Sequence, residues 1–443
     1  MRSRPVSFRP GGRVPSRALV LLALLAVPVG AGAQQGVPAD SALLLALRRT
    51  NPELAARRAA AVAAEARLLA TGFAPPLVLS AEAEEVPDGV NLAGAALRLG
   101  VEKEFLSGGR RSAERALAAT DVRTASAALL ATEQRLLAEA ARAALRIAGG
   151  TRIARRLAAE DSLLVGAEGA LRVRFSVGEA RYVDVLRLRT ERLRIQSERA
   201  EALTLAASGR RTLETLLAPA PDTLVERLVR TAADPLAGDT LPSAPDPDTL
   251  LARSGAVALA DAAVERSRAA RALVVAGQRP RVSASAGLQK FDGEGGAGFG
   301  PTLGASISLP STAARANRTA LAASEAQVGA AEAERTATVA ALRGALLAVR
   351  DRYEAARARL ALFDAALLRG ARQEREAALA AYGSGDLSLV ELLDFERALA
   401  RAEIQRVRAR IEAADALAEL LSSAAGNAGG ETSTFRLPSD DDR

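Results

Sequence analysis

The sequence predicts a mainly helical protein with a small β part, built from a duplicated helix–β-hairpin–helix unit. The stretch that begins at Pro76 returns at Pro280, 204 positions later, and Leu99-Gly100 returns at the same offset as Leu303-Gly304. Each copy also changes its apolar period from helical to alternating and back to helical. A repeat of this length indicates two structural copies of one unit.

The first copy contains every element of the unit. On both of its strands, apolar residues alternate with polar ones, which gives one apolar and one polar face. The first helix is broken only near Asn51-Pro52, because proline suits the first turn of a new helix. A turn is expected at Pro87-Asp88-Gly89. The predicted elements are a helix over Ser41–Thr71, strands at about 77–85 and 96–105, a long helix from about Ser107 to Phe175, and a shorter helix from about Glu179 to Leu217.

The second copy repeats this order. Its elements are strands at about 281–290 and 301–309, a long helix from about Ser311 to Ala381, and a shorter helix from about Asp386 to Ser422. The hairpin tip, Gly293–Gly298, has the spaced glycines of a dinucleotide-binding loop, but a strand rather than a helix follows, which excludes that function. In each copy the two shorter helices together match the long one, so we expect them end to end beside it. Gly149-Gly150 predicts a kink in the first long helix.

The chain is expected to divide into five segments. The first 33 residues resemble a secretory signal peptide, with a basic leader, the apolar run Ala18–Val27 and the small-residue site Ala31-Gly32-Ala33. The alternative, a membrane anchor, needs a longer apolar run. The segments are the signal peptide 1–33, the first repeat 34–218, a linker 219–247 rich in Pro, Asp and Thr, the second repeat 248–425 and a C-terminal tail 426–443.

Composition excludes several classes of function. The chain has no Cys, His or Trp, which removes thiol chemistry, haem ligation and imidazole-based acid–base or zinc chemistry. We therefore expect no enzyme, no catalytic or metal site and no cofactor. Five of the 59 basic residues lie in the first 33 positions, and the rest nearly balance the 52 acidic ones. No basic stripe is interleaved with aromatics, so we expect no nucleic-acid partner.

The amphipathic strands have two interpretations. They cover a soluble core, or they cross an outer membrane with lipid on one face and water on the other. Two hairpins among long helices find nothing to bury against within one chain. Four strands cannot close a barrel, and closure is required in lipid. Membrane-embedded hairpins therefore require oligomerisation, and three chains supply twelve strands.

The best local signal is the turn that ends each long helix. Phe175-Ser176-Val177-Gly178 in the first copy corresponds to Tyr382-Gly383-Ser384-Gly385 in the second. Gly178 and Gly385 are expected to end the long helices in the left-handed conformation. The simple interpretation is a helical hairpin turn. The sharper one places both turns at the end of the molecule opposite the strands.

With these turns, the chain resembles the TolC-like outer membrane efflux protein (outer membrane factor) family over essentially the whole mature length. The matching features are the signal peptide, the duplicated unit, Asn51-Pro52-Glu53-Leu54, the proline before each first strand, Gly108-Gly109-Arg110 and both turns. The resemblance implies a homotrimer in which a 12-stranded β-barrel, four strands per chain, continues into a long α-helical barrel of coiled-coil type. The linker and tail would form an equatorial girdle.

The resemblance also implies a function and its partners. The trimer would sit among outer-membrane lipids, extend into the periplasm as a tunnel, and serve as a passive exit duct of a tripartite efflux or type I secretion system. A periplasmic membrane-fusion adaptor and an inner-membrane transporter would be its partners. The sequence leaves the cargo open between drugs, metal ions and proteins.

The resemblance assigns roles to residues of both turns. Glu391 and Asp394 would ring the closed end of the tunnel, where crowded carboxylates select cations; the alternative for both is ordinary solvated helix charge. Asp184 and Tyr382 would tie neighbouring hairpins. The basic partner expected two positions after Gly385 is replaced by Leu387, which leaves Arg181 as the candidate substitute. The expected adaptor-docking residues are Val177, Gly178, Glu179, Ser384, Gly385 and Asp386.

Two other classes remain as alternatives. A periplasmic adaptor also carries a long helical hairpin, but it would have one such hairpin flanked by β-rich domains. A soluble coiled-coil scaffold would leave the four amphipathic strands without a role.

Overall fold

The computed structural model describes residues 39–71, 76–84, 96–105, 109–217, 223, 225–227, 229–230, 241–293, 296–308 and 314–423. The chain divides into two units, Met1–Val37 and Pro38–Arg443, and every described residue belongs to the second. The predicted signal peptide, the turn at Pro87-Asp88-Gly89, much of the linker 219–247 and the tail 426–443 therefore lie outside the described residues.

The described helices follow the predicted order in both copies. Those of the first copy are α1 (Ala39–Thr50), α2 (Pro52–Ala70), α3 (Arg110–Ser176) and α4 (Tyr182–Leu216). Those of the second are α6 (Pro247–Ala252), α7 (Gly255–Gly277), α8 (Ala314–Leu362), the π-helical turn η3 (Phe363–Leu367), α9 (Leu368–Ser384) and α10 (Leu389–Ser422). At about 1.5 Å per residue, the 67 residues of α3 extend about 100 Å.

The break between α1 and α2 is a helix cap. The Asn51 side chain accepts the backbone N–H of Leu54 at 3.1 Å and donates to the carbonyl of Leu216 at 2.9 Å. Pro52 fits the first turn of α2 because that position needs no N–H donor. Asn51 is buried, so one side chain both starts α2 and ties it to the end of α4.

The four strands form one antiparallel sheet in the order β1-β2-β3-β4. The strands are β1 (Val78–Glu84), β2 (Ala96–Phe105), β3 (Arg281–Gly293) and β4 (Gly296–Ser308). The two hairpins also pair with each other within one chain, because β2 lies beside β3 and places Leu99 opposite Leu288. The second hairpin also continues further than predicted, since Gly293 lies opposite Gly296. Glycine weakens a strand but keeps both backbone hydrogen-bonding groups, so the glycine-rich string can still pair.

The strand register gathers the apolar side chains on one face of the sheet, which we call the apolar face. Successive residues of a strand point to opposite faces, and the pairings keep the apolar positions aligned across all four strands. The face comprises Leu79, Ala81, Leu97, Leu99, Val101, Lys103, Phe105, Val282, Ala284, Ala286, Leu288, Lys290, Phe299, Pro301, Leu303, Ala305 and Ile307. Within a single chain it is uncovered: Leu303 is 88%, Leu79 78% and Phe299 74% exposed.

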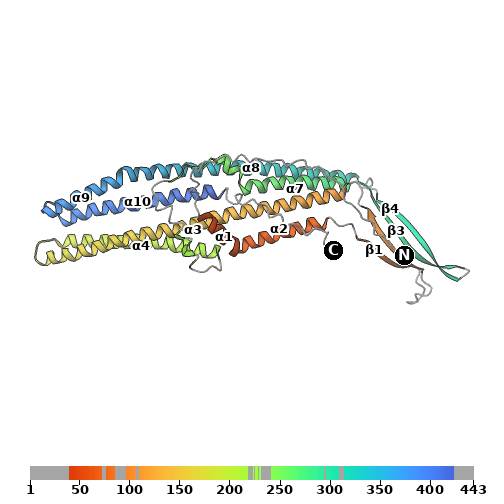
Figure 1. The fold of residues 1–443 in the computed structure, drawn as a ribbon, viewed down its shortest axis with the longest axis horizontal. Coiled ribbons are helices and arrows are strands. Elements are labelled where there is room, and N and C mark those ends of the chain that lie inside the picture. The colour runs from red at the N-terminus through yellow and green to blue at the C-terminus, as the bar shows by residue number, and fades with distance from the viewer. Residues whose placement is uncertain are drawn as a thin grey trace, which may run out of the picture. The chain divides into compact units, whose positions relative to one another are not determined.

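The helices pack as two long rods, each with two shorter partners. In the first copy α2 and α4 both pack along α3, and in the second α7 and α10 both pack along α8 (Figure 1). The end-to-end arrangement of the shorter helices is therefore confirmed. The two copies join because α3 also contacts α7 and α10.

The glycine pair in α3 serves close packing and leaves the helix unbroken. A Cβ at Gly149 would meet the Ile411 side chain at 2.2 Å, and one at Gly150 would meet the Ala202 carbonyl at 2.6 Å. The glycines therefore let α10 and α4 approach α3, which continues as one helix across the predicted kink. The irregular turn is instead η3 in the second copy, whose long helical run is four residues longer than α3. A π-helical turn accommodates extra residues without ending a helix.

Candidate functional site: the two helical tips

Each helical hairpin ends in the same turn, and both turns lie at the end of the helices away from the sheet (Figure 1). We call Phe175–Val185 the first tip and Tyr382–Leu392 the second tip. In the first, Glu179 N–H reaches the Arg174 carbonyl at 2.8 Å and Gly178 N–H reaches that of Phe175 at 3.0 Å. In the second, Asp386 N–H reaches the Ala381 carbonyl at 2.9 Å.

This bond pattern is the Schellman motif, which closes a helix through a residue with positive φ. Gly178 has φ of 81° and Gly385 has φ of 85°. No heavy atom lies within 4 Å of a Cβ built at either glycine. The backbone conformation alone therefore requires glycine here, as the sequence predicts.

The first tip is held by exposed contacts. Arg181 donates to the Asp184 carboxylate at 3.2 Å, and the rings of Phe175 and Tyr182 lie 5.5 Å apart. Arg181 starts α4 without a side-chain cap. Val177 and Val183 are each about two-thirds exposed. The first tip thus presents apolar side chains around one ion pair, and Glu179 beside Val177 is exposed as well.

Polar capping holds the second tip. Ser388 and Glu391 form a capping box: the Glu391 carboxylate accepts the Ser388 backbone N–H at 2.8 Å, and the Ser388 hydroxyl accepts that of Glu391 at 3.3 Å. These hydrogen bonds, the backbone one first, lower the pKa of Glu391. Ser384 also donates to Asp386 at 2.6 Å. Glu391 is therefore an ionised carboxylate with a structural role in starting α10.

Asp394 belongs to a group of charged side chains between the two hairpins that the sequence did not predict. It accepts from Arg397 at 2.7 Å, and Arg397, which is buried, also lies 3.8 Å from Glu191 of α4. Arg401 lies 3.9 Å from the same carboxylate. The available signal was helical spacing, because Leu393 and Ala400 are buried on the stripe of α10 that also holds Arg397.

A second missed set holds α3 to α4 within the first hairpin. Arg192 of α4 donates to Asp161 at 3.1 Å and to Glu168 at 2.7 Å, and Arg172 also pairs with Glu168. Glu168 is buried, and the hydrogen bond from Arg192 lowers its pKa. Nearby Glu160 is also buried, and its burial raises its pKa. We call the turns of α3 and α4 around Glu160, Glu168 and Arg192 the neck of the first hairpin. The neck therefore contains one paired carboxylate, Glu168, and one desolvated carboxylate, Glu160.

The structure brings some of the predicted tip residues together. Arg181 and Asp184 pair with each other inside the first tip, so the Asp184 carboxylate already has a basic partner there. Tyr382, half-buried at the end of α9, belongs to the other hairpin. The pairing of Asp184 and Tyr382 across neighbouring hairpins stays a prediction, as do the adaptor-docking residues.

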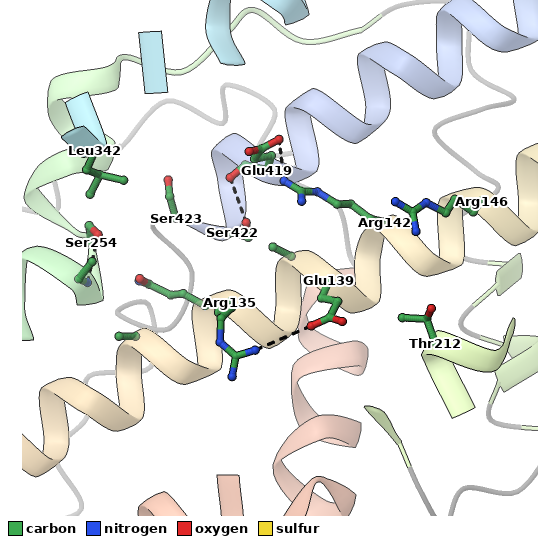
Figure 2. A pocket seen from close by; sticks show the side chains of 14 residues that line it. Arg135, Glu139, Arg142, Arg146, Thr212, Ser254, Leu342, Glu419, Ser422 and Ser423 are labelled. Atoms are coloured by element: carbon green, nitrogen blue, oxygen red, sulfur yellow. Dashed lines mark hydrogen bonds and ion pairs between the residues drawn. The ribbon is translucent and has the colours of Figure 1, made fainter. Parts of the chain in front are cut away.

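A cavity of about 610 Å³ lies midway along the helices, lined by residues of α3, α4, α7, α8 and α10 (Figure 2). Charged side chains of its lining pair with one another: Arg142 contacts Glu419 at 2.6 Å, and Arg135 lies 3.8 Å from Glu139. Among the described residues, no group of acidic side chains has a metal-binding arrangement. This cavity is therefore a polar junction between helices, with three arginines and two glutamates in its lining.

None of the described helices combines the length and apolarity needed to cross a bilayer. The described part of the chain combines two helical hairpins that end together with two β-hairpins that pair at the other end (Figure 1). This arrangement is the TolC-like fold that the sequence predicts.

Several solved structures of outer-membrane channels have a fold similar to that of this chain. The chain superposes on the outer-membrane channel OprN with a TM-score of 0.70 and 20% sequence identity, over 88% of this chain and 90% of OprN. The outer membrane protein VceC from Vibrio cholerae gives a TM-score of 0.68 with 18% identity, over 87% and 96%. The MtrE outer membrane channel of Neisseria gonorrhoeae gives 0.63 with 17% identity, over 88% and 89%. No protein-family model and no curated protein matches the sequence. The TolC-like fold inferred from the sequence is thus confirmed.

Proposed function

We propose that the chain is one subunit of a passive, trimeric exit duct in the outer membrane. In this role it would receive cargo from an inner-membrane pump through a periplasmic adaptor, in a tripartite efflux or type I secretion system. Its sheet would lie in the membrane and its helices would extend into the periplasm. The likeness to solved outer-membrane channels supports this proposal at the level of the fold.

The observation that carries the proposal is the uncovered sheet. Its apolar face has no cover within the described part of the chain, and β1 and β4 are its edges. In lipid both edges must pair, because unsatisfied backbone groups are costly there. Pairing β4 of one chain with β1 of the next would close three chains into a ring of twelve strands.

The opposite face of the sheet suits a water-filled lumen. It carries charged residues such as Arg98 and Glu102 beside residues with little or no side chain. Gly100 lies opposite Gly287, and a Cβ at Gly287 would meet the Leu99 carbonyl at 2.4 Å. Small side chains on this face leave space for solute, as polar interiors do in outer-membrane channels.

The tips supply the proposed docking end and aperture. Val177, Gly178 and Glu179 of the first tip, with Ser384, Gly385 and Asp386 of the second, would meet the adaptor. Glu391 and Asp394 would form the carboxylate ring. Their bonds to Ser388 and Arg397 place both near the start of α10, so a tunnel-lining role must coexist with the capping box. The signal peptide 1–33 would direct export.

Fractionation and a mass measurement test the proposal. The mature protein should fractionate with outer membranes, require detergent for extraction, and have three times the chain mass after correction for bound detergent. In planar bilayers it should conduct ions as a stable pore. Recovery of a soluble periplasmic monomer would overturn the proposal.

A further inference from the structure

The chain contains only two lysines, and both lie on the apolar face of the sheet. All other basic residues among its 59 are arginines. The register places Lys103 of β2 opposite Ala284 and Lys290 of β3 opposite Phe299, in line with the aliphatic residues of the same face. Lysine is therefore used only on the apolar face of the sheet, where a charged side chain is least expected.

Lys103 is exposed and has apolar same-face neighbours along β2 and across the sheet on the β3 side. Val101 and Phe105 precede and follow it on β2, and Ala284 with Ala305 beyond lies across the sheet. A lysine facing lipid costs about 2–4 kcal/mol at the bilayer midplane but only about 0–1 kcal/mol near an interface. If this face meets lipid, the ammonium group must reach a membrane surface.

The spacing of the lysines matches the height of a lipid-facing band. The row of Lys103 lies at Ala284, six residues from Lys290 along β3, which is about 20 Å of strand. A strand tilt of about 40° reduces this to about 15 Å along the membrane normal. The flexible lysine stems extend this span outward at each end, so that both ammonium groups can reach the edges of an apolar band about 25 Å tall.

An aromatic ring accompanies each lysine. Phe105 follows Lys103 two residues later on the helix side, and Phe299 lies directly opposite Lys290. Aromatic side chains collect at both membrane–water interfaces of outer-membrane barrels. Lysine suits such places better than arginine does, since its compact ammonium on a flexible stem can reach a headgroup while the stem stays in lipid.

We propose that Lys103 and Lys290 bind the phosphate groups of anionic lipids at the two opposite surfaces of the outer membrane, and so set the depth of the sheet in it. This rests on the proposed function, because it requires the apolar face to meet lipid. The ligand is a lipid headgroup phosphate, held by a charge-assisted contact to the ammonium group.

Lipid retention tests the binding. The trimer is reconstituted in vesicles of phosphatidylcholine mixed with phosphatidylglycerol, and native mass spectrometry counts the lipids that remain bound. Lys103→Leu should lower the ratio of retained phosphatidylglycerol to phosphatidylcholine about fivefold per site, while Lys103→Arg should keep it. The matched control is Arg98→Leu, on the polar face of the same strand, where Arg98 donates to Gln289 at 3.2 Å; it should leave the ratio unchanged.

A measurement on the wild-type chain tests the depth without relying on variants. Reductive ¹³C-methylation keeps the lysine charge and yields two ε-amine NMR signals, assigned with Lys103→Arg and Lys290→Arg. A spin label on the lipid headgroup should broaden both signals more than a label in the middle of the acyl chain. Stronger broadening by the mid-chain label, or unchanged lipid retention in Lys103→Leu, would overturn the inference alone. A chain that fails to insert into vesicles would overturn the proposed function and this inference with it.

Discussion

Replacing Glu168 by glutamine should loosen the first helical hairpin without unfolding the rest. The Glu168 side chain is only 4% exposed, and its Oε2 accepts from Arg192 at 2.7 Å. Removing one partner of a buried pair costs about 3–5 kcal/mol when the other charge is left alone. Here Asp161 still pairs with Arg192 at 3.1 Å, and the exposed Arg172 adds little. We therefore expect a loss of about 2 kcal/mol in the local opening free energy.

Hydrogen exchange measures this loss directly. A change of about 2 kcal/mol corresponds to about 30-fold faster exchange of amides in the facing turns of α3 and α4. The exposed Glu201 of α4 gives a matched control, Glu201→Gln, that should leave exchange unchanged. Acceleration below about threefold, or acceleration spread evenly to α8, would refute the assignment of Arg192–Glu168 as the contact that holds this neck.

The pH dependence of the same variant gives an independent check. Because the pKa of Glu168 is lowered in the folded chain, its contribution is present above the ordinary carboxyl pKa and is lost as pH falls through the lowered value. The difference between wild type and Glu168→Gln should therefore be full at neutral pH and should disappear at strongly acidic pH. A difference that persists unchanged in acid would contradict the role of the charge.

Three further predictions concern packing, the aperture and the desolvated carboxylate. Gly150→Ala should lower thermal stability by about 1–3 kcal/mol because its Cβ would meet the Ala202 carbonyl, whereas Gly166→Ala, with open space around it, should be neutral or stabilising by up to about 1 kcal/mol. Glu391→Gln combined with Asp394→Asn removes both charges while glutamine can keep the capping box; planar-bilayer recordings should show weaker cation preference, and an unchanged preference would exclude both residues from the aperture. Because burial raises the pKa of Glu160 in the folded chain, exchange protection near it should increase as pH falls through that raised value toward the ordinary carboxyl pKa, and Glu160→Gln should flatten this dependence.

The element order could be predicted because it depends on local patterns. The change between helical and alternating periods located every strand and long helix, and the two turn glycines marked where α3 and α9 end. The pairing of β2 with β3 could not be predicted, because neither hairpin turn specifies which strand lies beside the other hairpin. The close packing at Gly149-Gly150 could not be predicted for a similar reason. A glycine pair permits both a kink and a close approach of neighbouring helices, and only the positions of Ile411 and Ala202 show the close approach.

The charges near the tips were harder to interpret, since most of the helical surface is charged. On a helix with arginines and glutamates on several faces, periodicity does not show which pairs become buried. Glu168 and Arg397 acquire their importance only when α4 packs on α3 and α10 reaches Glu191. Conversely, Glu391 was expected from the family resemblance to line an aperture, and its nearest partner proved to be its own helix cap.

The duplication makes the two tips equivalent in backbone but different in what stabilises them. Both use a Schellman turn through glycine, so the same conformation is specified twice. After that turn the copies diverge. Ser388 and Glu391 satisfy N–H groups at the start of α10, and an N-cap serine such as Ser388 contributes about 1 kcal/mol. At the start of α4 the corresponding stabilisation comes from Arg181, whose side chain is 84% exposed, pairing with Asp184, whose side chain is 16% exposed. An ion pair with one freely exposed partner contributes up to about 1 kcal/mol. Because this pair is also screened by salt, raising ionic strength weakens the first tip and leaves the capping box of the second largely intact.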